Sequence, residues 1–240
     1  MKKTIYILTL ILSTNFSLFS QESNWTDLFN GENLDGWHTY NKNVKKKIKK
    51  WYVENGELIL DSNNDNISRG NDIVTNKKYT NFELSIEWNI PFGGNSGVMF
   101  GVEEIKGMGE PWQTGPEIQV LDNDNFADGN SLAIHLAPAL YDLKPVDQIE
   151  YNSYGKWNHL LLKIDHDNNL GSITFNGNFV YSFALSGPEW DKMISKSKFN
   201  NPSHPQYVIA PLFGKFKTGK IALQDHGFAV RYRNIKIREL

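Results

Sequence analysis

The sequence predicts an all-β protein, an antiparallel β-sandwich or jelly roll with one short helix. Strand-like runs recur at short intervals, aromatic residues make up 13% of the chain, and 19 glycines punctuate the runs. The chain has no regular alternation of strands and helices, which argues against a parallel α/β sheet, and no repeat of fixed period. Two packed antiparallel sheets would bury one face of each run.

Residues 1–20 have the features of a secretory signal peptide. Lys2 and Lys3 are basic, residues 5–18 are mainly apolar, and Ser20 precedes a polar stretch. The apolar segment is too short to span a bilayer, and no later stretch approaches that length. The chain has no cysteine, which excludes a lipobox anchor and disulfides. We therefore expect a secreted or periplasmic protein with one mature domain over residues 21–240.

The charge balance argues against nucleic acid as a partner. Without residues 1–20, 23 basic side chains face 27 acidic ones, a net charge of −4. A nucleic-acid-binding domain would need a basic surface. We interpret the lysine-rich run at residues 45–50 as a solvated loop, and contact with an anionic polymer or lipid headgroups is the alternative.

The expected strands show period-two alternation. The clearest one spans residues 82–90, where five apolar residues share one face, four polar residues share the other, and Pro91 ends the strand. Asn176-Gly177 predicts a tight hairpin, because both central residues of a type I′ turn need positive φ. The other strands expected before the C-terminal segment are residues 51–54, 57–60, 98–102, 117–121, 159–165, 172–176 and 179–183.

One helix and a final strand complete the prediction. Pro188 suits a first helical turn, and residues 189–198 follow, with Met193 and Ile194 on the apolar side. Lysines near the end of this helix would favour it through the macrodipole. Residues 230–238 alternate as a strand with one buried face.

A polar cluster precedes this last strand. Gln224, Asp225, His226 and Arg231 flank Gly227, where two strands are expected to meet. A rigid sheet would hold such side chains still enough for chemistry. The alternative is a hydrogen-bonded corner.

Two further segments could carry chemistry. The glycines around Asn95 and Ser96 permit a bulge or the close approach of a ligand, or they form an ordinary hairpin connection. Glu117 and Gln119 share one face of their strand, with Trp112 a few residues upstream. Carboxylate and amide groups hydrogen-bond sugar hydroxyls while an aromatic face packs on a sugar ring. This segment suits a carbohydrate site, and a solvent-facing polar stripe is the alternative.

Three aspartates raise the question of calcium. Asp122, Asp124 and Asp128 do not match an EF-hand loop, because Phe126 and Ala127 stand where a ligand and the glycine should be. An irregular calcium site with oxygen ligands remains open. The chain contains no nucleophile elbow, phosphate loop, HExxH helix or dinucleotide fingerprint.

Short segments along nearly all of the chain after residue 20 match a known protein family in their order. They are DLFNGENLDGW at 27–37, WYVENGEL at 51–58, NFEL at 81–84, GNSGV at 94–98, GPE at 115–117, QVLDN at 119–123, WN at 157–158, IALQDHG at 221–227 and RNIKIR at 233–238. On these segments the chain resembles the 3-keto-disaccharide hydrolase domain family. That family is also described as a 3-keto-glucoside 1,2-lyase and 3-keto-2-hydroxy-glucal hydratase domain.

The resemblance implies a concanavalin A-like jelly roll with its ligand on the concave sheet. It also implies a substrate already oxidised to a ketone at C3 of the sugar. Such a ketone acidifies the proton on C2, so the group at C1 can leave by β-elimination and water can then add back. This route needs a base, an acid for the leaving oxygen and a group that stabilises the enolate oxygen.

The matched polar positions are the candidates for these roles. We expect Glu117 and His226 to be the base and acid, in either order, with Asp122 or Asp225 orienting the histidine. If a divalent cation such as calcium stabilises the enolate instead, Glu117, Asp122 and His226 are its expected ligands. The residues expected to bind the carbohydrate substrate are Asn95, Trp112, Gln119, Gln224 and Asp225.

Two other functions compete with this one. A carbohydrate-binding module without turnover would keep the tryptophans and amides but would tolerate the loss of Glu117 and His226. A retaining glycosidase would need two carboxylates about 5 Å apart, and the sequence lacks the tightly spaced acidic pair of laminarinase-like strands. Binding without catalysis is therefore the main alternative.

Overall fold

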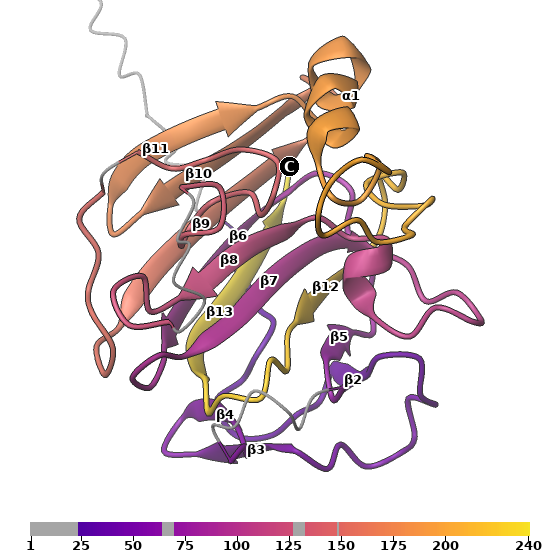
Figure 1. Ribbon diagram of the computed structural model, residues 1–240. Coiled ribbons are helices and arrows are strands. Elements are labelled where there is room, and N and C mark those ends of the chain that lie inside the picture. The colour runs from indigo at the N-terminus through magenta and orange to yellow at the C-terminus, as the bar shows by residue number, and fades with distance from the viewer. Residues whose placement is uncertain (1–23, 64–69, 127–132, 148) are drawn as a thin grey trace, which may run out of the picture.

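In the described part of the chain, two antiparallel sheets pack face to face, with one α-helix beside them (Figure 1). The computed structural model describes residues 24–63, 70–126, 133–147 and 149–240. The predicted sandwich with one short helix is confirmed. The predicted signal peptide and Asp128 lie outside the described residues. No helix among the described residues is both long and apolar enough to cross a membrane.

The larger sheet has eight strands within the described chain. They are β1 (Thr26–Asp27), β3 (Trp51–Glu54), β4 (Glu57–Leu60), β6 (Phe82–Asn89), β9 (Asn158–Asp165), β10 (Leu170–Phe175), β11 (Asn178–Phe183) and β13 (Arg231–Glu239). Seven of them lie in the order β11-β10-β9-β6-β13-β4-β3, and β1 pairs with β13. The strands predicted here from alternation are present, with bounds that differ by at most two residues.

Strand β6 shows why the alternation of apolar and polar residues predicted the strands of this sheet. Its burial alternates residue by residue, so that Phe82, Leu84, Ile86 and Trp88 enter the core. Its outward residues pair across to the neighbouring strand, as in the ion pair of Arg233 Nε with Glu87 Oε2 at 2.8 Å. One face therefore packs while the other is solvated.

The alternation of β13 changes phase in the middle of the strand. Tyr232 is buried, but the next buried residues are Ile235 and Ile237. The pairing with β6 shifts register between Arg233 and Lys236. Asn234 has a φ of 51°, which marks a bulge at this point. The predicted buried face is thus kept on both sides of the bulge.

The smaller sheet carries three of the predicted site residues, Asn95, Glu117 and Gln119. Its strands are β2 (Trp37–Thr39), β5 (Ile73–Thr75), β12 (Lys220–Leu223), β7 (Asn95–Val102) and β8 (Glu117–Leu121), in the order β2-β5-β12-β7-β8 within the described chain. Strand β7 begins three residues before the predicted start, so Asn95 belongs to the strand and not to a connection. Val98 and Phe100 on β7 pack into the core with Ile118 and Val120 on β8. By alternation, Asn95, Gly97, Glu117 and Gln119 face away from the core.

The helix α1 (Gly187–Lys196) starts one residue before the predicted first-turn Pro188 and ends two residues earlier than predicted. Its buried side chains are Trp190 and Ile194, and Met193 is only partly buried. Lys198 therefore lies beyond the helix. Residues 45–50 form an irregular segment with mostly exposed lysines, as the solvated-loop interpretation predicted.

Candidate active site

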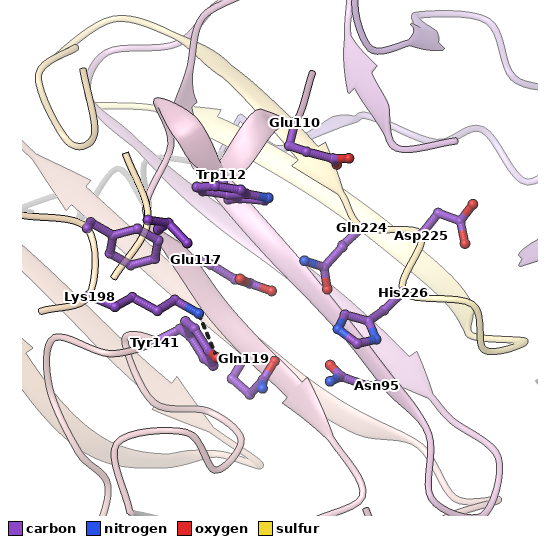
Figure 2. Close-up of a pocket in the computed structure, with 12 residues that line it drawn as sticks. Asn95, Glu110, Trp112, Glu117, Gln119, Tyr141, Lys198, Gln224, Asp225 and His226 are labelled. Atoms are coloured by element: carbon purple, nitrogen blue, oxygen red, sulfur yellow. Dashed lines mark hydrogen bonds between the residues drawn. The ribbon is translucent and has the colours of Figure 1, made fainter. Parts of the chain in front are cut away.

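A cavity of about 370 Å³ lies over the outward face of the smaller sheet (Figure 2). This volume is in the range of small-molecule binding sites. Seven of the eight predicted site residues line the cavity, and Asp122 does not. The lining residues come from β7, β8, the segment after β12, the 3₁₀ helix η1 (Pro111–Gln113) and nearby loops. They are Asn95, Glu110, Trp112, Glu117, Gln119, Tyr141, Lys198, Phe199, Val208, Gln224, Asp225 and His226.

Gly97 provides the space at the floor of this cavity. On β7 Gly97 lies opposite Gln119 of β8, and its carbonyl accepts a hydrogen bond of 3.0 Å from the backbone N–H of Gln224 on the other side. The three residues therefore form one row across the sheet. A Cβ atom at Gly97 would lie 1.8 Å from Glu117 Oε1, so the Glu117 carboxyl occupies the space that a side chain would fill. The Glu117 carboxyl is therefore positioned over Gly97, between Gln119 and Gln224.

Burial changes the acidity of Glu117. Its side chain is only 8% exposed. Removal from water raises the pKa of the Glu117 carboxyl to about 8, although the positive charge of Lys198 acts in the opposite direction. At neutral pH most molecules therefore hold Glu117 in its neutral form, which can donate a proton.

Glu117 should make the folded state less stable as the pH rises. Its folded pKa is about 8 against an ordinary value of 4.5, so its contribution is fully present below pH 4.5 and is lost as the pH rises through 8. At about 1.4 kcal/mol per pKa unit, the loss is about 5 kcal/mol. Denaturant unfolding of the wild type and Glu117→Gln between pH 4.5 and 9 measures this difference. A difference that stays constant with pH would contradict a buried neutral Glu117.

His226 lies on the segment after β12, between the cavity and two phenylalanines. Its ring stacks on Phe228 with centroids 6.3 Å apart and meets the Phe126 ring edge-on at 6.2 Å. These contacts orient the imidazole from the side opposite the cavity. In Figure 2 the imidazole faces the side chains of Gln224 and Asn95.

The two aspartates expected to orient His226 have different positions. Asp225 accepts hydrogen bonds from Asn71 N at 3.1 Å and from Gly227 N at 3.0 Å, and Figure 2 shows its carboxylate directed away from the imidazole. Asp225 therefore shapes the turn on which His226 stands. Asp122 Oδ2 accepts hydrogen bonds from Gly93 N at 2.9 Å and from Asn125 Nδ2 at 3.0 Å, so it links the turn before β7 to the turn after β8 and does not line the cavity.

Lys198 and Tyr141 are lining residues that the sequence did not indicate. Lys198 Nζ donates a hydrogen bond of 3.0 Å to Tyr141 Oη and lies 4.4 Å from the centre of that ring. The backbone N–H of Lys198 donates to Asp142 Oδ2, and Asp142 Oδ1 lies 2.9 Å from His135 Nε2. The His135 ring in turn stacks on Tyr141 at 4.6 Å. Together these contacts fix Lys198 and Tyr141 at the cavity wall.

Two amide oxygens in the cavity lack hydrogen-bond donors. Asn95 Oδ1 and Gln224 Oε1 are buried, and no donor for either is found in the described part of the chain. An unsatisfied buried polar atom costs about 1–3 kcal/mol. A ligand that carries hydroxyl groups would satisfy both atoms. The cavity is therefore suited to a polyhydroxylated molecule.

The lining residues do not fit the divalent cation considered from the sequence. Residues 24–63, 70–126, 133–147 and 149–240 contain no group of three histidine, aspartate or glutamate side chains arranged to hold a metal ion. The expected ligand set of Glu117, Asp122 and His226 is not brought together, because Gly93 and Asn125 bind the Asp122 carboxylate outside the cavity lining.

Comparison with solved structures places the fold among carbohydrate-active proteins. Two Parabacteroides distasonis proteins, each provisionally named a glycosyl hydrolase, are 28% and 26% identical to this chain, with TM-scores of 0.78 and 0.66. Each alignment covers 90% of this chain, and 94% and 99% of those chains. A Bacillus licheniformis β-glucanase has the same fold at 9% identity and a TM-score of 0.50, over 90% of this chain and 97% of its own. The predicted concanavalin A-like, glucanase-type sandwich is therefore confirmed.

Comparison with protein families agrees with the resemblance found in the sequence. A curated 3-keto-disaccharide hydrolase of Bacteroides thetaiotaomicron is 28% identical over 230 residues, which cover 89% of this chain and 77% of the relative. The family model of the 3-keto-alpha-glucoside-1,2-lyase-like domain matches residues 24–238, nearly the whole described chain. The chain belongs to this family of 3-keto-disaccharide hydrolase and 3-keto-alpha-glucoside-1,2-lyase-like domains.

Proposed function

We propose that this chain cleaves 3-keto-glycosides, with 3-keto-disaccharides as the substrate class, by elimination followed by hydration. Family membership supports a keto-sugar substrate. The observation that carries the reaction is the buried Glu117 carboxyl, which is neutral near pH 7 and lies in one cavity with His226. A neutral acid beside an imidazole can serve the two proton transfers that an elimination requires.

In the first step, His226 removes the proton from C2 of the sugar. The electrons form an enolate with its oxygen at C3, which the amide N–H groups of Asn95 and Gln119 stabilise. The enolate then collapses, a double bond forms between C1 and C2, and the bond from C1 to the leaving oxygen breaks. Glu117 gives its proton to that oxygen, so the departing group leaves as a neutral alcohol.

In the second step, water adds across the new double bond. The Glu117 carboxylate takes a proton from the water as its oxygen bonds to C1. The His226 imidazolium returns a proton to C2. Both side chains recover their starting forms, and the sum of the two steps is hydrolysis of the glycosidic bond.

Purified protein should release 3-keto-glucose from a 3-keto-disaccharide and should leave the unoxidised disaccharide intact. The C3 ketone is what makes the C2 proton acidic, so its absence removes the first step. Chromatography of the two reaction mixtures measures this. The rate should also fall above pH 8, where Glu117 loses the proton that it donates.

A carbohydrate-binding module makes the opposite prediction. It would bind both sugars and release nothing. Undiminished release of 3-keto-glucose by both Glu117→Ala and His226→Ala would contradict the roles proposed for these residues.

A further inference from the structure

The cavity has a defined axis along strand β7. Asn95, Gly97 and Met99 follow one another on the outward face of this strand, and two steps of this kind span about 13 Å. Trp112 packs on the apolar cluster that contains Met99. Asn95 and Trp112 therefore mark opposite ends of the cavity, and the Glu117 carboxyl lies between them over Gly97.

The end at Trp112 has an apolar wall, with the Glu110 side chain beside it (Figure 2). The Trp112 ring lies 6.0 Å from the ring of Phe199, and Phe199 stacks on the buried Phe213 at 3.9 Å with only 13° between their planes. Val208 lines the cavity beside them. Because Phe213 supports Phe199 from behind, this wall has rigid aromatic faces.

The end at Asn95 is polar. It holds the two amide oxygens that lack donors in the described chain, Asn95 Oδ1 and Gln224 Oε1, together with Gln119 and His226. These groups suit the hydroxyl-rich keto sugar that undergoes elimination. Figure 2 shows Trp112 on one side of the Glu117 carboxyl, and Gln224, His226 and Asn95 on the other.

We propose that Trp112, Phe199 and Val208 form the leaving-group subsite, and that this subsite selects ring-shaped leaving groups with a flat apolar face. With the keto sugar at the polar end and Glu117 at the scissile oxygen, the leaving group lies against the apolar wall. An aromatic ring or the C–H face of a second sugar packs there, whereas a small alcohol leaves the wall uncovered. The inference rests on the proposed function, since it assigns one part of that same site.

Benzyl and methyl 3-keto-glucosides are the probes that isolate this subsite. Their leaving alcohols have nearly the same acidity, so a difference between them reports packing against the wall and not the ease of bond cleavage. We expect kcat/KM to be about tenfold higher for the benzyl compound, the size of effect that one aromatic packing contact provides.

Substitutions of the wall should remove this preference. Trp112→Ala and Phe199→Leu should bring the benzyl-to-methyl ratio toward one, whereas Trp112→Phe, which keeps an aromatic face, should retain most of it. Phe92→Ala is the matched control, because Phe92 is an aromatic residue that is 63% exposed and does not line the cavity. A ratio near one in the wild type, or a ratio that Trp112→Ala leaves unchanged, would overturn the proposal.

Binding measurements distinguish an error in the proposed subsite from an error in the proposed function. If neither compound is cleaved, the proposed reaction is wrong, and calorimetry on Glu117→Gln then decides the subsite alone. That variant should bind the benzyl compound about tenfold more tightly than the methyl compound, and adding Trp112→Ala should abolish the difference. Equal affinities of Glu117→Gln for the two compounds would overturn the proposed subsite, whether or not the protein catalyses the proposed reaction.

Discussion

Glu117→Gln should lower kcat for a 3-keto-disaccharide by about 10³-fold and leave the protein folded. The amide has the shape of the neutral carboxyl that occupies this buried position, so it needs no additional space and adds no buried charge. It cannot transfer a proton to the leaving oxygen, nor can it take one from water in the second step. The loss should therefore appear in kcat more than in KM.

The control for this variant is Glu83→Gln on the outward face of the larger sheet. Glu83 pairs with Arg238 at the surface and lies outside the cavity lining, so its replacement should leave kcat unchanged. Steady-state kinetics across pH provide the measurement. The decrease in rate above pH 8 should be absent from the residual activity of Glu117→Gln. Near wild-type kcat in this variant would show that another group protonates the leaving oxygen.

Gly97→Ala should lower kcat by about 10²-fold although it adds only one methyl group. The new Cβ atom would overlap Glu117 Oε1 at 1.8 Å and Glu117 Cδ at 2.6 Å, so one of the two residues has to move. Strand β7 is hydrogen-bonded on both edges, to β8 and to the segment that holds Gln224. The side chain of Glu117 is therefore the part that moves, and displacing a reacting group by about 1 Å can cost about 10²-fold.

A second glycine provides the control for the steric effect of the added methyl group. At Gly109 an added Cβ atom meets nothing within 4 Å, and Gly109 does not have a positive φ. Gly109→Ala should keep wild-type kcat and melting temperature. Circular dichroism on both variants checks that the fold is retained. Equal activities of Gly97→Ala and Gly109→Ala would mean that the position of Glu117 over Gly97 does not matter for turnover.

Local patterns in the sequence predicted much of the fold because most strands bury one face. The alternation in β6 is visible in the residues themselves, as is the turn at Asn176-Gly177. The short strands β2 and β5 were not predicted. Each has only three residues and little exposure, so neither alternates visibly between apolar and polar residues.

Most of the predicted site residues converge because they lie on one face of adjacent strands. The two-residue period of a strand also explains why Asp122 does not line the cavity with them. Glu117 and Gln119 share the outward face of β8, whereas Asp122 follows the strand out of phase with them and accepts hydrogen bonds from Gly93 and Asn125. Lys198 and Tyr141 could not be predicted in this way, because loops that meet only through tertiary packing bring them to the cavity.

The hydrogen on C2 of the sugar distinguishes elimination from direct displacement at C1. A 3-keto-disaccharide with deuterium at C2 of the keto sugar can be compared with the unlabelled compound under conditions in which the chemical step limits the rate. If His226 removes this hydrogen while Glu117 protonates the leaving oxygen, the deuterated substrate should react measurably more slowly. Equal rates for the two compounds, with the deuterium kept at C2 of the released keto sugar, would mean that the C2–H bond stays intact, and that the glycosidic bond breaks by a different route.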